Sequence, residues 1–172
     1  MKNGSAKKQA YTSTKMMITK LKPYWPLIAL VGTSALAVTA INPGGTHMWM
    51  HYFMGFFLCV FALLKIFNPA SFAKGFAKYD LLAKRSRAYG MFYPFIELAL
   101  GLGYLSFWHP QLVYLATIAV LGFGTIGVLN ALRQGLNINC PCMGNILQVP
   151  LSTVTLTENL SMVAMAAFML IR

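Results

Sequence analysis

Acidic side chains are nearly absent from this chain, since only three of its 172 residues are Asp or Glu, and charged residues of both signs make up 10%. Soluble domains carry about 25% charged residues, so a water-soluble globular domain is disfavoured. Nucleotide-, haem- and quinone-binding motifs are also missing from the sequence. Apolar residues, in contrast, are abundant, with 58% hydrophobic residues and a mean hydropathy of +0.61. The composition therefore indicates a protein that lies in lipid.

The basic residues give the chain a net charge of +11, which on its own is compatible with nucleic-acid binding. Their distribution argues against that partner, because twelve of the fourteen lie in two runs beside apolar segments. Such runs are typical of loops on the cytoplasmic side of a membrane. The two runs are Lys2, Lys7, Lys8, Lys15, Lys20 and Lys22, and Lys65, Lys74, Lys78, Lys84, Arg85 and Arg87.

Five apolar stretches are long enough to cross a hydrocarbon core, which takes about 20 helical residues. None shows the two-residue alternation of a membrane strand, so we predict helices. The expected fold is an all-α, polytopic membrane helix bundle, a single transmembrane domain at 24–172 that follows a basic cytoplasmic tail at 1–23. The expected spans are about 24–41, 48–67, 89–108, 111–132 and 153–171.

The direction of the spans follows from the same basic residues. With the N-terminus in the cytoplasm, thirteen of the fourteen lie on the cytoplasmic side, and the outer loops 42–47 and 109–110 contain no Lys or Arg. The small residues "SALA" at 34–37 would also suit a signal-peptide cleavage site. The charged region of more than twenty residues before the first span is long for a signal peptide, so we expect the span to be retained.

The most unusual segment is "NINCPCMGN" at 137–145, within the connection 133–152. Cys140 and Cys142 are one residue apart, so a disulfide between them closes a small, strained and easily reduced ring. Pro141 fixes its own φ and disfavours helical geometry at Cys140, which holds the pair preorganised. A ring this small removes almost no entropy from the unfolded chain, so a purely structural disulfide would add little stability. The pattern favours a thiol–disulfide redox pair.

Other interpretations of the pair are open. Adjacent thiolates next to the thioether of Met143 suit a soft metal such as copper or zinc, and two unreactive thiols are the simplest case. A metal site could also include His47 and His51, which share one face of a helix in "HMWMH" at 47–51 together with two methionines. The same residue types are typical of a helix that begins at the membrane interface, and we favour that interpretation for the histidines.

Two carboxylates lie within the expected spans. Glu97 would cost at least about 2.5 kcal/mol if it faced lipid, so we expect it inside the bundle with a partner, near the depth of Cys59. Glu158 begins the last span near the level of the cysteine pair and is a candidate for proton transfer during thiol exchange. Structural roles are also open: Glu97 as a hydrogen-bonded acid that orders the bundle, and Glu158 as an acid at a helix N-terminus. Cys59 is expected to be a small buried apolar residue.

Two parts of the sequence resemble known families. The run 55–105 is similar to the DoxX-like pattern, with a glycine-bearing helix that ends in Lys65, "NP" at 68–69, Tyr79–Leu81 and a following helix that contains Glu97. The part "LRQGLNINCPCMGN" with "LTENLSMVA" resembles the Cys-x-Cys-x-Gly element of the MauE (methylamine utilisation) family, placed before the last helix. Together the resemblances imply a four-helix DoxX/MauE-like core plus an N-terminal helix.

The resemblance implies a multi-pass protein of the bacterial inner membrane that supports disulfide formation or maturation of exported proteins such as methylamine dehydrogenase. It also implies a thioredoxin-like partner. We expect no cofactor, because the sequence has no nucleotide-, haem- or quinone-binding motif. Only five residues match pattern positions: Cys140, Cys142, Gly144, Lys65 and Glu97. Pro141 and Met143 depart from the glycine and phenylalanine that the pattern has more often, and a Cys-Pro-Cys also resembles the transmembrane metal site of heavy-metal P-type ATPases.

We therefore expect Cys140 and Cys142 to cycle between dithiol and disulfide, with Glu158 and Glu97 assisting as acid–base groups, so that the chain acts as a thiol–disulfide oxidoreductase. The charge topology places the pair on the cytoplasmic side. Either the loop enters the bundle and communicates across it, or this end is the one at which electrons enter, which we favour. The alternative is a membrane protein that binds or transports copper, mercury or zinc through Cys140, Cys142, Met143, His47 and His51. A third possibility is a non-catalytic assembly factor.

Overall fold

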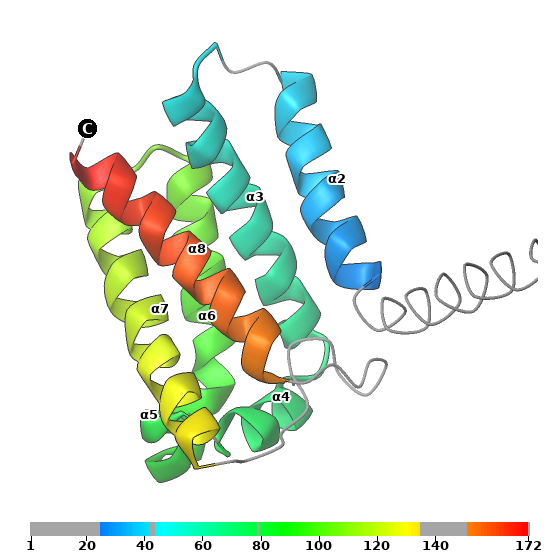
Figure 1. Ribbon diagram of the computed structural model, residues 1–172, viewed down its shortest axis with the longest axis vertical. Helices are drawn as coiled ribbons and strands as arrows, with labels where there is room; N and C mark the ends of the chain where they lie inside the picture. The colour runs from blue at the N-terminus through cyan, green and yellow to red at the C-terminus, as the bar shows by residue number, and fades with distance from the viewer. Residues whose placement is uncertain (1–24, 42–43, 79, 135–150, 172) are drawn as a thin grey trace, which may run out of the picture.

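The computed structural model is a bundle of long helices with two short helices at one end (Figure 1). It describes residues 25–41, 44–78, 80–134 and 151–171, and this part of the chain contains no β-strand. The long helices are α2 (Trp25–Ile41), α3 (Thr46–Ile66), α6 (Arg87–Leu105), α7 (Pro110–Arg133) and α8 (Leu151–Ile171). The short helices are α4 (Pro69–Phe76) and α5 (Leu81–Arg85). The predicted all-α class is confirmed.

Membrane-spanning character is clearest in two of these helices. Within the described residues, α3 and α7 are long and apolar enough to cross a membrane. Helices α2 and α8 contribute the shorter apolar stretches Leu27–Ile41 and Leu156–Ile171. All five long helices start and end within a few residues of the predicted spans, whereas a crossing of the membrane by all five stays a prediction.

The short helices α4 and α5 were not predicted, although the sequence contains their start signals. The Asn68 side chain accepts a hydrogen bond from the Ser71 backbone N–H at 3.1 Å, and Pro69 occupies the first turn of α4, where its missing N–H costs nothing. Asp80 caps α5 by accepting hydrogen bonds from the backbone N–H groups of Leu82 and Ala83 at 3.0 and 2.8 Å. Together these helices turn the chain back from the end of α3 to the start of α6 (Figure 1).

The long helices of the core form two closely packed pairs, α3 with α6 and α7 with α8, and α2 packs on α3 from outside. Glycines allow the close approach of α3 and α6. A Cβ atom at Gly101 would lie 2.7 Å from Cys59 Sγ, and one at Gly55 would lie 2.8 Å from Leu105 Cγ. The register of the first pair is therefore fixed by backbone contact.

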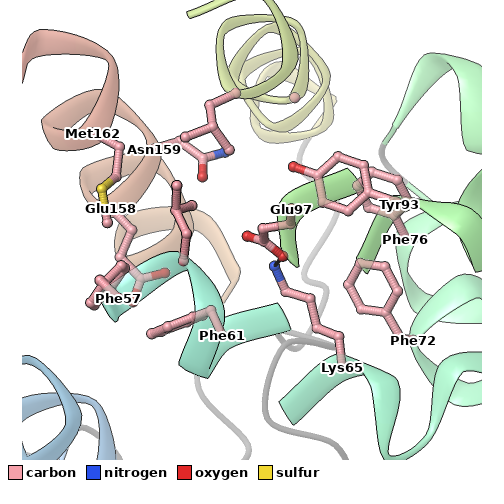
Figure 2. A pocket seen from close by; sticks show the side chains of 13 residues that line it. Phe57, Phe61, Lys65, Phe72, Phe76, Tyr93, Glu97, Glu158, Asn159 and Met162 are labelled. Atoms are coloured by element: carbon pink, nitrogen blue, oxygen red, sulfur yellow. Dashed lines mark hydrogen bonds and ion pairs between the residues drawn. The ribbon is translucent and has the colours of Figure 1, made fainter. Parts of the chain in front are cut away.

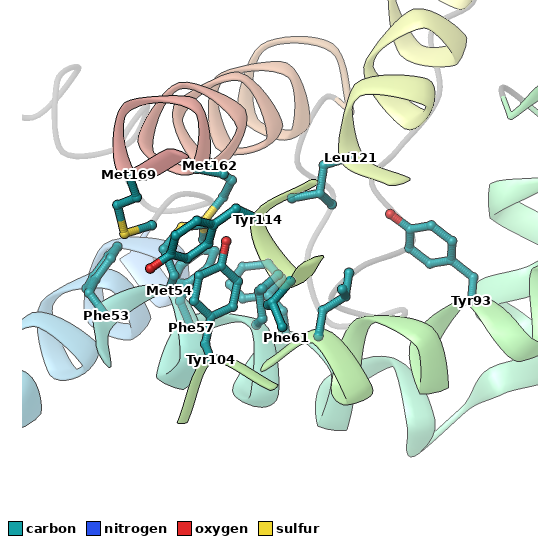
Figure 3. Close-up of a cluster of buried hydrophobic side chains, with 14 of the residues drawn as sticks. Phe53, Met54, Phe57, Phe61, Tyr93, Tyr104, Tyr114, Leu121, Met162 and Met169 are labelled. Atoms are coloured by element: carbon teal, nitrogen blue, oxygen red, sulfur yellow. The ribbon is translucent and has the colours of Figure 1, made fainter. Parts of the chain in front are cut away.

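Between the two pairs lies a core of aromatic and methionine side chains (Figure 3). Phe53, Phe57 and Phe61 of α3 form a stack, with ring centroids 5.7 and 4.4 Å apart along it. They are buried together with Met162 and Met169 of α8. This core holds the second pair of helices against the first and so positions the polar residues described next.

Candidate functional site

A buried ion pair joins the first pair of helices. The Lys65 ammonium, in the last turn of α3, donates to Oε2 of Glu97 in the middle of α6, and each side chain is only 6% exposed (Figure 2). Glu97 thus lies inside the bundle with a partner, as its position within an apolar span predicted. The charge pattern had grouped Lys65 with the basic residues of the cytoplasmic loops, but the structure shows that its side chain is buried.

Three aromatic rings surround the Lys65 ammonium. Its Nζ atom lies 5.5 Å from the ring centroids of Phe72 and Tyr93 and 5.8 Å from that of Phe61. Rings within about 6 Å of a cation attract it through their negative faces. The rings and the Glu97 carboxylate both attract the ammonium, so the ion pair lies enclosed by aromatic side chains in an apolar interior.

Next to the ion pair is a cavity of about 30 Å³ between the two helix pairs. Glu97 and Lys65 line it from one side and Glu158 and Asn159, both of α8, from the other (Figure 2). Gly124 of α7 also lines it, and a Cβ atom there would lie 3.6 Å from the Asn159 side-chain nitrogen. This volume has room for about two water molecules, although most of the residues that line the cavity are apolar or aromatic. The cavity therefore brings two carboxylates of different helices, Glu97 of α6 and Glu158 of α8, to one place inside the bundle.

The sequence-predicted site residues are only partly described by the structure. Cys140, Cys142 and Met143 lie outside the described residues. Glu97 and Glu158, which were predicted separately, line one cavity. The end of α7 and the start of α8, between which the cysteines occur in the sequence, both lie at the end of the bundle that carries α4 and α5 (Figure 1).

Cys59 is half-buried on α3 and forms no disulfide within the described residues. Its sulfur faces Gly101, one turn beyond Glu97 on α6. The depth that counting predicted for Cys59 relative to Glu97 is therefore confirmed to within a helical turn. Its fit against a glycine is that of a small packing residue.

The two histidines of α3 lie at the opposite end of the bundle from the cavity. His51 is fully buried, its Nδ1 is 2.9 Å from the Tyr114 hydroxyl in a hydrogen bond, and its ring stacks on Phe107 at 4.2 Å. His47 is partly buried, and its ring lies edge-on to that of Tyr114 at 6.5 Å. Phe107 has a φ of 54°, in the left-handed region that non-glycine residues seldom adopt. The histidines share one face of α3, as predicted, but Nδ1 of His51 already has a partner.

Within the described residues, no three His, Cys, Asp or Glu side chains come close enough together to hold a metal ion. The sulfur ligands of the alternative metal site, Cys140, Cys142 and Met143, lie outside the described residues.

Sequence reasoning missed the partner of Glu97, the aromatic cage and the contribution of Asn159. A lysine at the end of an apolar stretch carried the only signal, and it is ambiguous because such lysines usually extend towards water. One of the three rings of the cage, that of Phe72, belongs to α4, and this helix was not predicted.

Comparison with known proteins gives one family. The family model described as "Methylamine utilisation protein MauE" matches residues 44–172, three quarters of the chain, from just before α3 to the end. Helix α2 lies outside the match. No curated protein and no solved structure matches the chain.

Proposed function

Because the chain belongs to the MauE family and is a membrane protein, we propose that it supports disulfide formation or maturation of exported proteins in the bacterial inner membrane. In this proposal Cys140 and Cys142 exchange electrons with a thioredoxin-like partner. The family match is to a methylamine utilisation protein, so proteins of the methylamine dehydrogenase type are the expected beneficiaries.

The observation that carries the proposal is the cavity in which Glu97 and Glu158 converge. Glu158 lies two turns after the start of α8, and Cys140 lies six residues beyond Gln134, the C-cap of α7. Six residues of chain span at most about 22 Å, whereas a helix of the length of α7 (24 residues) is about 36 Å long. The length of the chain between Gln134 and Cys140 therefore tethers Cys140 to the end of the bundle at which Glu158 lies.

The proposed exchange balances without a further reactant. A thiolate of the Cys140/Cys142 pair attacks the partner's disulfide, so one S–S bond breaks and a mixed disulfide forms. The second cysteine then attacks, which closes the Cys140–Cys142 disulfide and releases the partner as a dithiol. Two electrons pass to the partner, and the two thiol protons pass to its leaving thiolates. Glu158 and Glu97 relay these protons through the cavity waters, and the reverse direction uses the same steps.

We further propose a topology of five spans with a cytoplasmic N-terminus, residues 1–23 as a cytoplasmic tail, and 24–172 as one transmembrane domain. Support comes from the five long helices and from outer turns without basic residues. Single cysteines placed at Gly44 and at His109 should react with a membrane-impermeant maleimide in intact spheroplasts. Labelling of either position only after lysis contradicts the proposed orientation.

Differential alkylation tests the redox role. In membranes from growing cells, Cys140 and Cys142 should take up a thiol reagent only after reduction, and Cys140→Ser and Cys142→Ser should each abolish maturation of the disulfide-bearing client. Cys59→Ser is the matched control and should leave maturation unchanged, because Cys59 packs against α6. A pair that is fully reduced in cells, with serine variants that retain maturation, refutes the redox role.

The same membranes can distinguish metal binding from the redox role, and they can also test the two cavity carboxylates. Protection of the two thiols from alkylation by added Cu(I), without any dependence on reduction, favours metal binding. Glu158→Gln should slow thiol exchange and change its pH profile, because an amide cannot relay a proton. Asp80→Asn is the control, since Asp80 is the remaining carboxylate of the chain and does not line the cavity.

A further inference from the structure

The end of the bundle that carries α4 and α5 has a strongly basic surface. Five cationic side chains are exposed there, and none of them is paired with a carboxylate within the described residues. These residues, which we call the basic collar, are Lys74, Lys78, Lys84, Arg85 and Arg87. The collar begins in α4, continues through α5 and ends at the first residue of α6.

Nothing negative on the protein surface balances this charge. The chain has three acidic residues, and none is exposed: Asp80 and Glu97 are 1% and 5% exposed, and Glu158 is half-buried. Asp80, the acid nearest to the collar in sequence, caps α5, because its carboxylate accepts hydrogen bonds from the backbone of that helix. The positive field of the collar is therefore uncompensated and attracts an anionic partner.

In the topology proposed above, on which this inference rests, the collar lies at the level where the bundle leaves the membrane. Helix α3, which is long enough to span, ends at Ile66, and the chain passes directly into α4. Phe67 between them is 85% exposed and Leu82 on α5 is 46% exposed. Helix α4 turns Phe72 and Phe76 inward, while Lys74 on α4 and Lys78, two residues beyond its end, are exposed. Exposed apolar side chains beside cations are typical of elements that lie at the lipid headgroups.

We propose that the basic collar binds the phosphate-bearing headgroups of anionic lipids in the cytoplasmic leaflet. Phe67 and Leu82 enter the acyl boundary, and the collar cations contact the headgroup phosphates. Cations near such a surface each raise the affinity by about fivefold at moderate ionic strength. An acidic protein segment would satisfy the charge but would leave the exposed apolar side chains without a partner, so the lipid is the occupant that matches both features.

The test measures lipid selectivity of the full-length chain in mixed micelles of phosphatidylglycerol and phosphatidylcholine, by counting the lipids retained on the protein in native mass spectrometry. The wild type should retain phosphatidylglycerol preferentially. The triple variant Lys74→Gln, Lys78→Gln, Lys84→Gln should lower that preference at least about fivefold. The charge-preserving variant with arginine at the same three positions should keep it.

The matched control removes the same charge elsewhere, through Lys2→Gln, Lys7→Gln and Lys8→Gln in the N-terminal tail. If the tail variant loses as much selectivity as the collar variant, the binding depends on net charge and the collar is not a site. Unchanged selectivity in the collar variant also overturns the proposal. Binding of a poly-glutamate peptide that depends on the collar, with lipid selectivity that does not, would show an acidic protein partner instead. Because all three positions are exposed, thermal unfolding in phosphatidylcholine should be the same for every variant.

Discussion

Replacing Lys65 by methionine tests the buried ion pair most directly, because methionine keeps an unbranched apolar side chain and removes only the ammonium. Glu97 would then remain in the interior, 5% exposed, without its cation. Breaking a buried pair by removing one partner costs about 3–5 kcal/mol, because the other charge is left uncompensated. Loss of the cation from the cage of Phe61, Phe72 and Tyr93 adds to that cost.

The reverse single substitution, Glu97→Leu, leaves the ammonium without its carboxylate and should cost a similar amount. Replacing both residues together removes the buried charges, and such apolar replacements are often neutral or stabilising. The double variant should therefore recover most of the loss, which gives a coupling free energy of at least about 3 kcal/mol. This value is large against a total stability of about 5–15 kcal/mol.

Reversible unfolding in mixed detergent micelles, followed by far-ultraviolet circular dichroism, gives the four free energies of the cycle. Lys74→Met, on the exposed face of α4, is the control and should change the free energy of unfolding by no more than about 0.5 kcal/mol. Additive losses in the double variant would refute the reasoning, because they would mean that Lys65 and Glu97 do not stabilise each other.

Three further predictions concern packing, hydrogen bonding and pH. Gly101→Ala should destabilise the protein by about 1–3 kcal/mol, because its Cβ would lie 2.7 Å from Sγ and 2.9 Å from the backbone nitrogen of Cys59. Adding Cys59→Ala should restore only part of the lost stability, since the contact with the backbone nitrogen stays. Full restoration of stability would contradict this account. Tyr114→Phe should lower the free energy of unfolding by about 1–3 kcal/mol, because Nδ1 of the buried His51 loses its hydrogen-bond partner; an unchanged midpoint in denaturant titration argues against it. For Asp80, burial raises the pKa of the carboxyl, although the N–H groups it caps oppose the shift. A raised folded-state pKa means a contribution to stability that is full below the unfolded value of about 3.9 and is lost as the pH rises through the folded pKa. Asp80→Asn, which still caps α5, should therefore stabilise the protein more at pH 7 than at pH 4, and equal effects at both pH values would show that the carboxyl is not perturbed.

The long helices could be predicted because each depends on a property of a continuous stretch of sequence. Helices α3 and α7 have apolar runs of the length that a hydrocarbon core requires. Helices α4 and α5 escaped prediction because they are short and lack a long apolar run, so only their capping residues Asn68 and Asp80 mark them.

For the candidate site, too, one feature could be predicted from the sequence and others could not. The placement of Glu97 inside the bundle followed from the cost of a carboxylate in lipid. Its partner did not follow, because Lys65 is 32 residues away and the contact depends on how far α3 is shifted along α6. The meeting of Glu97 with Glu158 depends in addition on how the second pair of helices is placed against the first.

By itself, then, the sequence determined the long apolar helices and the placement of Glu97 inside the bundle. These outcomes depend on transfer free energies that each segment has regardless of its neighbours. Only the tertiary structure decided that Lys65 lies in an aromatic cage against Glu97 and that Glu97 and Glu158 line one cavity. The physical reason is that helix register is set by close contacts between distant segments, such as Gly101 against Cys59, and no single stretch of sequence contains them.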